Sequence, residues 1–229
     1  MLLPMKIILA SGSPRRRELL QQVGLEFSVM SADIDESVYE AETPQAYIQR
    51  MVAQKAQAAL AVLNADTACL ADNEQGSTLL LLTADTIGIL PDGKTILIKP
   101  EDEVHALNMW QQMSASTHQV CTAVQATLLT LQSVQDTDNT DTNLLFTNVW
   151  SQSLLESTEV TFVTLSEQEM QRYWQTGEPA DKAGGYAIQG GAAHWVERIK
   201  GSYTNVVGLP SAQTLALIEQ AEASAATLS

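Results

Sequence analysis

A strand, a turn of small residues and a helix follow one another without interruption near the start of the sequence. Lys6–Ala10 reads as a short buried strand, and Ser11-Gly12-Ser13 reads as a turn. Ser13 is a good N-cap residue and Pro14 suits the first helical position, so the sequence predicts a helix over Pro14–Val23. A strand that leads directly into a helix favours an α/β fold.

The rest of the chain alternates between helical and extended patterns. Further helices are expected to begin at Thr43-Pro44, near Glu101, at Ser166 and at Ser211. Further strands are expected over Leu79–Leu90, Thr95–Ile98, His118–Leu131, Leu144–Ser151, Glu159–Leu165 and Trp195–Ile199. The polar stretches 64–78 and 132–143 are expected to be loops. Because hairpins and crossovers both occur in this order, the sheet is expected to be mixed.

Charge and composition limit the kinds of partner. The 229 residues include 12 Lys and Arg against 27 Asp and Glu, and this net charge of -15 argues against nucleic-acid binding. Cys69 and Cys121 have no metal-like or disulfide-like spacing, so we expect two buried thiols. No apolar run is long enough for a membrane span or a secretory signal, so the protein is expected to be cytoplasmic, with no membrane partner.

Three consecutive arginines, Arg15, Arg16 and Arg17, stand at the start of the first expected helix. Free N–H groups and the helix dipole at such a terminus favour an anion. Guanidinium groups add forked donors that suit phosphate oxygens. Three arginines in so acidic a chain favour anion binding, although an exposed helix face remains the alternative.

Asp85 interrupts the long apolar run of an expected strand. A carboxylate there is costly unless it meets a cation, a metal or hydrogen-bond donors. A structural aspartate bonded to backbone amides explains the pattern equally well. Asp33, Asp35 and Glu36 form a second acidic cluster, and a meeting of Glu36 with Asp85 would give a pair able to hold a divalent ion.

Glycines surround polar side chains in the segment Asp181–Gly190, which contains Lys182, Tyr186 and Gln189. Glycine permits close approach of the backbone to a ligand, and a Gln amide can both donate to and accept from a base edge. A tight structural loop with a buried Tyr is the alternative. Gly201–Pro210 is expected to be another such loop.

Other candidates carry less information. Lys99 directly follows the expected hairpin strand. His105, His118 and His194 are scattered along the chain, and each is expected to be structural or exposed instead of catalytic.

Taken together, these segments resemble the Maf family of nucleotide pyrophosphatases. They occur in the family's order, cover nearly the whole chain and leave little room for chance agreement. The segments are Leu9-Ala10-Ser11-Gly12-Ser13-Pro14-Arg15-Arg16, Lys55-Ala56, Ala84-Asp85-Thr86, Lys99-Pro100, His118-Gln119-Val120-Cys121-Thr122, Asp181–Gly190 and Asn205–Pro210.

The resemblance implies a fold and an activity. The fold is an elongated mixed sheet with flanking helices and two lobes around a deep cleft, in one domain over residues 1–229. The activity is hydrolysis of a nucleoside triphosphate to the monophosphate and pyrophosphate, with a divalent cation, Mg²⁺ or Mn²⁺. A homodimer is left open.

Roles for individual residues also come from the resemblance. Asp85 resembles the family's catalytic base, and Glu36 resembles the acidic residue near the metal. The residues expected around the triphosphate are Ser11, Arg15, Arg16, Lys55, Lys99 and Lys182. The sequence does not separate a base at Asp85 from a metal ligand or a group that orients water.

Three positions distinguish branches of the family. Arg15, Thr86 and Gln189 resemble the branch that acts on dTTP and UTP, and modified pyrimidine nucleotides are implied as further substrates. Trp, Gln and Glu are typical of the corresponding positions in the branch that acts on 7-methylguanosine triphosphate.

The chain departs from the family pattern at a few places. Ile98 stands where a small or polar residue is common, and Ser114-Ala115-Ser116 lacks the usual glycine. The acidic insertion 132–143 lengthens the chain. A non-catalytic nucleotide-binding regulator is the competing hypothesis, whereas nucleic-acid binding through Arg15–Arg17 conflicts with the charge.

Overall fold

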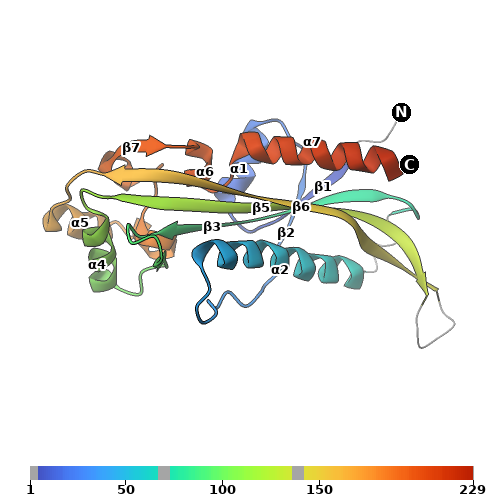
Figure 1. The fold of residues 1–229 in the computed structure, drawn as a ribbon, viewed down its shortest axis with the longest axis horizontal. Coiled ribbons are helices and arrows are strands. Elements are labelled where there is room, and N and C mark those ends of the chain that lie inside the picture. The colour runs from blue at the N-terminus through green and yellow to red at the C-terminus, as the bar shows by residue number, and fades with distance from the viewer. Residues whose placement is uncertain (1–4, 67–72, 136–141, 229) are drawn as a thin grey trace.

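Seven strands form one mixed sheet in the described parts of the computed structural model, which are residues 5–66, 73–135 and 142–228. The strand order is β2-β1-β3-β5-β6-β7, with the short β4 paired to β3 (Figure 1). β2, β1 and β3 are parallel, and every later pair is antiparallel. The strands are β1 Lys6–Ala10, β2 Ser28–Met30, β3 Thr78–Ile89, β4 Ile96–Leu97, β5 Thr117–Gln135, β6 Thr142–Phe162 and β7 Val196–Lys200. The expected α/β fold with an elongated mixed sheet is confirmed.

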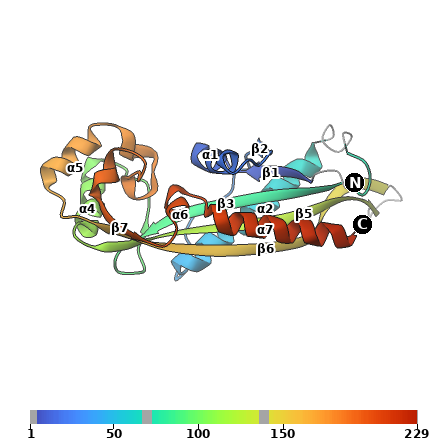
Figure 2. The same ribbon diagram turned by 90° about the horizontal axis from the view of Figure 1, so that it is seen from above.

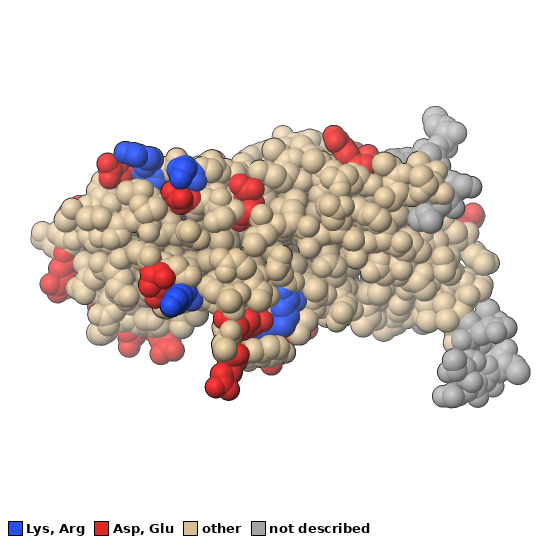
Figure 3. Space-filling model, in the orientation of Figure 1, with Lys and Arg blue, Asp and Glu red and all other residues tan. Residues whose placement is uncertain are grey.

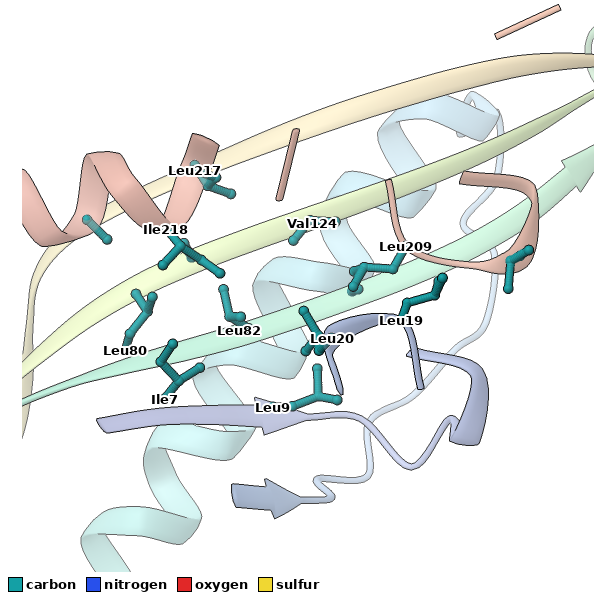
Figure 4. Packing of buried hydrophobic residues seen from close by; sticks show 14 residues of the cluster. Ile7, Leu9, Leu19, Leu20, Leu80, Leu82, Val124, Leu209, Leu217 and Ile218 are labelled. Atoms are coloured by element: carbon teal, nitrogen blue, oxygen red, sulfur yellow. The ribbon is translucent and has the colours of Figure 1, made fainter. Parts of the chain in front are cut away.

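Helices cover both faces of this sheet. α1 (Pro14–Gln22) and α7 (Ser211–Leu228) lie on one face, and α2 (Pro44–Ala65) lies on the other (Figures 1 and 2). The core beneath α1 and α7 is built from aliphatic side chains such as Leu20, Leu82 and Ile218 (Figure 4). Burial of each such side chain contributes about 1.5–3 kcal/mol.

A third group of elements packs at one end of the sheet (Figure 1). α4 (Glu103–Met113) and α5 (Glu167–Trp174) meet around Trp110 and Trp195, both fully buried. Short 3₁₀ turns follow α5 at Glu178–Asp181, Ala183–Gly185 and Gly191–Trp195. They bring the glycine-rich segment back against this end of the sheet.

Capping residues place the helix starts. Thr43 Oγ1 accepts from the Ala46 N–H at the start of α2, and Ser166 with Glu169 forms a capping box at the expected start of α5. Ser13 occupies the N-cap position of α1 but its side chain makes no capping bond there. Its backbone N–H donates instead to Ser11 Oγ at 3.3 Å.

The region after β5 corrects two predictions. Strands expected separately at Leu144–Ser151 and Glu159–Leu165 are one continuous strand, β6, because its ladder with β5 runs without a break through the polar middle. The loop expected over 132–143 is wrong at both of its ends, since β5 continues to Gln135 and β6 begins at Thr142. Residues 136–141 lie outside the described parts.

Three further expectations concern the segment Gly201–Pro210, the two cysteines and membrane-spanning helices. The segment Gly201–Pro210, expected to be a loop, contains the short helix α6 (Tyr203–Val207), capped by Ser202. Cys121 is buried as expected, and burial raises the pKa of its thiol, whereas Cys69 lies outside the described residues. No described helix is both long enough and apolar enough to cross a membrane. The division into two lobes and the limits of the single domain stay predictions.

Candidate active site

A cavity of about 840 Å³ opens where the first half of the sheet meets the glycine-rich segment. Its wall combines the end of β1, the start of α1, the middle of β3 and the segment after β4 with residues from 181–189 and 206–208. All ten residues singled out from the sequence line it: Ser11, Arg15, Arg16, Glu36, Lys55, Asp85, Thr86, Lys99, Lys182 and Gln189. The structure therefore brings together side chains from both ends of the chain.

Arg16 is the most firmly held cation of the wall. Its Nε donates to the Gly208 carbonyl at 2.9 Å, Nη1 to Ser11 Oγ at 3.0 Å and Nη2 to Thr86 Oγ1 at 3.0 Å. Burial lowers the pKa of the Arg16 guanidinium, and the nearby Asp85 opposes this change. Because three bonds fix its plane, Arg16 is preorganised and needs little reordering to meet a ligand.

Asp85 lies on β3, and its carboxylate is placed between two cations. Its Oδ1 is 3.1 Å from Lys55 Nζ and 3.9 Å from Arg16 Nη2, and its side chain is 18% exposed. Lys55 Nζ also lies 3.0 Å from Glu36 Oε1. The side-chain partners found for Asp85 are therefore cations, and Glu36 contacts the same ammonium group.

The loop that carries Glu36 is fastened to α2. Tyr47 Oη donates to the Glu36 carbonyl at 3.0 Å, and burial together with Asp85 and Glu36 raises the pKa of Tyr47 to about 12. Arg50 donates to both carboxylate oxygens of Glu42, at 2.7 and 2.6 Å, and lies over the Tyr39 ring. These contacts hold Glu36 at the cavity.

Hydroxyl groups behind the cavity form a hydrogen-bonded chain. Thr122 Oγ1 donates to the Asn205 carbonyl at 3.1 Å, which leaves it free to accept from Thr86 Oγ1 at 3.0 Å. Thr86 Oγ1 in turn accepts from Arg16. The Asn205 amide is fully buried and donates to the Val120 carbonyl at 2.9 Å. Thr86 thus orients Arg16, and its hydroxyl lies within hydrogen-bonding distance of both Thr122 Oγ1 and, at 3.3 Å, the Gly208 carbonyl.

The opposite wall is less tightly bonded. Lys182 Nζ contacts the Glu178 carbonyl and Asp181 Oδ1, both at 2.7 Å. Arg15, Lys99 and Gln189 are exposed side chains at the cavity. A polyphosphate entering here meets cations from both walls, which balances its negative charge.

Positive charge on the outer surface is paired with negative charge. On the face drawn in Figure 3, each blue group lies next to a red one. Surface ion pairs of this kind, such as Lys200 with Glu159 at 3.2 Å, contribute little to binding or stability.

His118 is a core residue, as expected for a structural histidine. It is fully buried, and its Nε2 lies 2.7 Å from the Tyr186 hydroxyl, while its ring packs edge-on against Phe162. Burial lowers the pKa of His118 to about 4, so the ring is neutral at pH 7. Tyr186, which it supports, lines the cavity.

Comparison with known proteins agrees with this arrangement. The family profile described as Maf-like protein matches residues 6–221. The chain belongs to the Maf family. A relative named dTTP/UTP pyrophosphatase from Psychrobacter arcticus is 57% identical over 94% of this chain and 95% of that protein. Relatives with the same name from Psychrobacter cryohalolentis and Acinetobacter baylyi are 57% and 39% identical, each over 94% of this chain.

Two residues of this Maf site were missed by sequence reasoning. Tyr47 was not singled out from the sequence, yet its hydroxyl holds the Glu36 backbone. Gly208 was noted within a motif, but a backbone carbonyl that accepts from Arg16 leaves no mark in a single sequence. The Maf segment Asn205–Pro210 was the signal available, and it did not say which atom of the segment matters.

Proposed function

We propose that this protein hydrolyses dTTP and UTP, and modified pyrimidine nucleotides, to the monophosphate and pyrophosphate. The observation that carries the proposal is a cavity in which a carboxylate, Asp85, lies among Arg16, Lys55, Lys99 and Lys182. Relatives named dTTP/UTP pyrophosphatase, 57% identical over nearly their whole length, support the substrate class.

The reaction needs an oriented water molecule and charge balance on the leaving group. The oxygen of water bonds to phosphorus, the anhydride bond between the α and β phosphates breaks, and the electron pair leaves with pyrophosphate. Asp85 accepts a hydrogen bond from this water and takes its proton. Arg16 and Lys55 balance charge on the phosphates beside it, and Lys99 and Lys182 do so from the opposite wall.

A divalent cation, Mg²⁺ or Mn²⁺, belongs to the same proposal. Glu36 and Asp85 both contact Lys55 Nζ, so their carboxylates face the same point of the cavity and are the pair that would hold the ion. No cluster of three or more His, Cys, Asp or Glu able to hold a metal occurs among the described residues. This fits Mg²⁺, which commonly uses one or two carboxylates plus substrate phosphates. When bound, the ion would neutralise phosphate charge. Chelation is expected to abolish turnover, and added Mg²⁺ or Mn²⁺ to restore it.

Pyrophosphate release tests the proposal. Purified protein with Mg²⁺ or Mn²⁺ should release pyrophosphate from dTTP and UTP faster than from the other nucleoside triphosphates. Asp85→Asn should lower kcat by about 10²–10⁴-fold, because the amide cannot accept a proton. Glu159→Gln, which changes a surface carboxylate away from the cavity, is the matched control and should leave kcat unchanged.

Two results would contradict the proposal. Tight binding of dTTP without turnover would support the regulator hypothesis instead. An Asp85→Asn variant as active as the wild type would remove this residue from the reaction.

A further inference from the structure

Gln189 lies on a short turn that is bound at both of its ends. At one end the Ala187 N–H donates to Tyr173 Oη at 3.2 Å. At the other end the Gly191 N–H donates to Glu178 Oε2 at 2.8 Å. The Gln189 side chain is exposed at the cavity, so its position depends on these two anchors.

The Glu178 carboxylate fits closely against the backbone of this turn. A Cβ atom at Gly190 would overlap the carboxylate, and one at Gly191 would lie 3.1 Å from Glu178 Oε2. The turn also closes on itself, because the Gly190 N–H donates to the Ala187 carbonyl at 3.1 Å. The two glycines therefore allow the carboxylate to approach the peptide that follows Gln189.

The other anchor is rigid. Tyr173 is 5% exposed and packs against Trp110 and Trp195, with ring centroids 5.5 and 4.8 Å away. Burial, with a smaller contribution from Glu178, raises the pKa of the Tyr173 hydroxyl, so it keeps its proton. The hydroxyl can thus accept from Ala187 and donate to another group at the same time.

Glu178 also reaches the phosphate side of the cavity. Its backbone carbonyl accepts from Lys182 Nζ at 2.7 Å. One residue therefore contacts Lys182 through its main chain and the turn of Gln189 through its side chain. Lys182 carries a cation and Gln189 an amide, but the positions of both depend on Glu178.

We propose that Glu178 is a positioning residue for base selection. Its carboxylate fixes the Gln189 turn, while its backbone carbonyl holds Lys182. This inference rests on the proposed hydrolysis of dTTP and UTP. Loss of the carboxylate leaves the Lys182 contact in place and frees the turn. The prediction is a selective loss of pyrimidine preference, since displacements of about 1 Å in a positioning group can lower rates up to about 10²-fold.

The test compares Glu178→Ala with Glu178→Gln. Values of kcat and KM are measured for dTTP and GTP, and thermal unfolding checks that each variant folds. Glu178→Ala should lower the ratio of kcat/KM for dTTP to that for GTP by about tenfold, mainly through a higher KM for dTTP. Glu178→Gln keeps an acceptor for the Gly191 N–H and should restore the ratio to within about threefold of the wild type.

A second variant keeps the test decisive if Glu178→Ala does not fold. Tyr173→Phe removes one hydroxyl, preserves the packing and should also lower the dTTP-to-GTP ratio. An unchanged ratio in every folded variant, or an equal fall in kcat for both nucleotides, would overturn the inference while leaving the hydrolysis intact. A wild-type protein that releases no pyrophosphate from any nucleotide would instead overturn the proposed function.

Discussion

At the scale of single residues, the two sides of the cavity differ in how firmly their side chains are held. Arg16 is fixed by three hydrogen bonds, whereas Gln189 presents an exposed side chain on a turn fixed through its backbone. Fixed cations suit the phosphates, which every nucleotide shares. A free amide side chain suits the base, where donor and acceptor positions decide recognition.

Replacing Gln189 tests its expected role in base recognition. The carboxylate introduced by Gln189→Glu is ionised at neutral pH and can only accept, so this variant should lose the hydrogen bond to a pyrimidine carbonyl. We expect kcat/KM for dTTP and UTP to fall by about 10–100-fold, with a smaller fall for the other nucleotides. Unchanged relative rates across a panel of nucleoside triphosphates would remove Gln189 from base selection.

His118 should make stability depend on pH. Its pKa is lowered from an ordinary value of 6.5 to about 4 by burial, so the folded state favours the neutral ring. The resulting stabilisation is complete above pH 6.5 and is lost as the pH falls from 6.5 towards 4, a change of about 3 kcal/mol.

Urea unfolding between about pH 4 and pH 7 measures this effect. His118→Gln keeps a polar group for the Tyr186 hydroxyl but does not titrate, so its free energy of unfolding should fall less steeply over the same range. Carboxylates contribute equally to both proteins, which makes the difference specific for His118. Parallel curves would contradict the prediction.

At the scale of elements, the turn between α4 and β5 carries strain. Ala115 has φ 49°, a left-handed conformation, and it stands in the segment that lacks the family's usual glycine. Left-handed backbone costs a non-glycine residue about 1–2 kcal/mol, which a glycine would not lose. The greater entropy of glycine in the unfolded chain offsets about 0.4–1 kcal/mol of this gain.

Ala115→Gly should therefore raise the free energy of unfolding by about 0.5–1 kcal/mol, measured by urea denaturation. Ala61→Gly is the control, because Ala61 is exposed inside α2 and ordinary helical geometry there makes glycine destabilising by about 1 kcal/mol. Destabilisation by both changes would show that Ala115 is not strained.

Local chemistry explains which elements could be predicted. β1, the start of α2 and the capping box of α5 follow from short sequence patterns, and all three are confirmed. β6 was divided in two because its polar middle looks like a loop, while the ladder with β5 that keeps it extended is a tertiary contact. The helix α6 was missed because five residues are too few to show a helical period.

The side chains of the site were predicted from the sequence, but their hydrogen-bond partners were not. Motifs identified the ten side chains that line the cavity, because each motif carries a charged or amide group beside glycine or apolar residues. Their partners were not identified, since the carbonyl of Gly208 and the anchors of the Gln189 turn belong to distant parts of the chain. Sequence reasoning thus found the chemistry but not the supports.

At the scale of the whole molecule, the long β5–β6 hairpin extends away from the cavity. Its far end lies at the opposite end of the molecule from α4 and α5 (Figure 1). Among the described residues that line the cavity, Val120 is the contribution of β5, and β6 supplies none. Gln135 and Thr142 are paired across the hairpin.

Replacing residues 136–141 with Asn-Gly tests whether the acidic insertion serves catalysis. Asn-Gly suits a two-residue hairpin turn, and Gln135 and Thr142 already face each other. We expect kcat/KM for dTTP within about twofold of the wild type, because shortening the connection between Gln135 and Thr142 in this way changes closure entropy by less than about 1 kcal/mol. A large loss of activity with an unchanged melting temperature would assign the insertion a catalytic role.

The bond from Arg16 to the Gly208 carbonyl also sets an order of events during synthesis. The ribosome makes Arg16 192 residues before it makes Gly208. A nascent chain in which Arg16, Lys55 and Asp85 have already been synthesised still lacks the Gly208 carbonyl, which orients the Arg16 guanidinium. A chain that ends before Gly208 lacks this acceptor, so we expect it to hydrolyse nucleotides more slowly than a chain that includes Gly208.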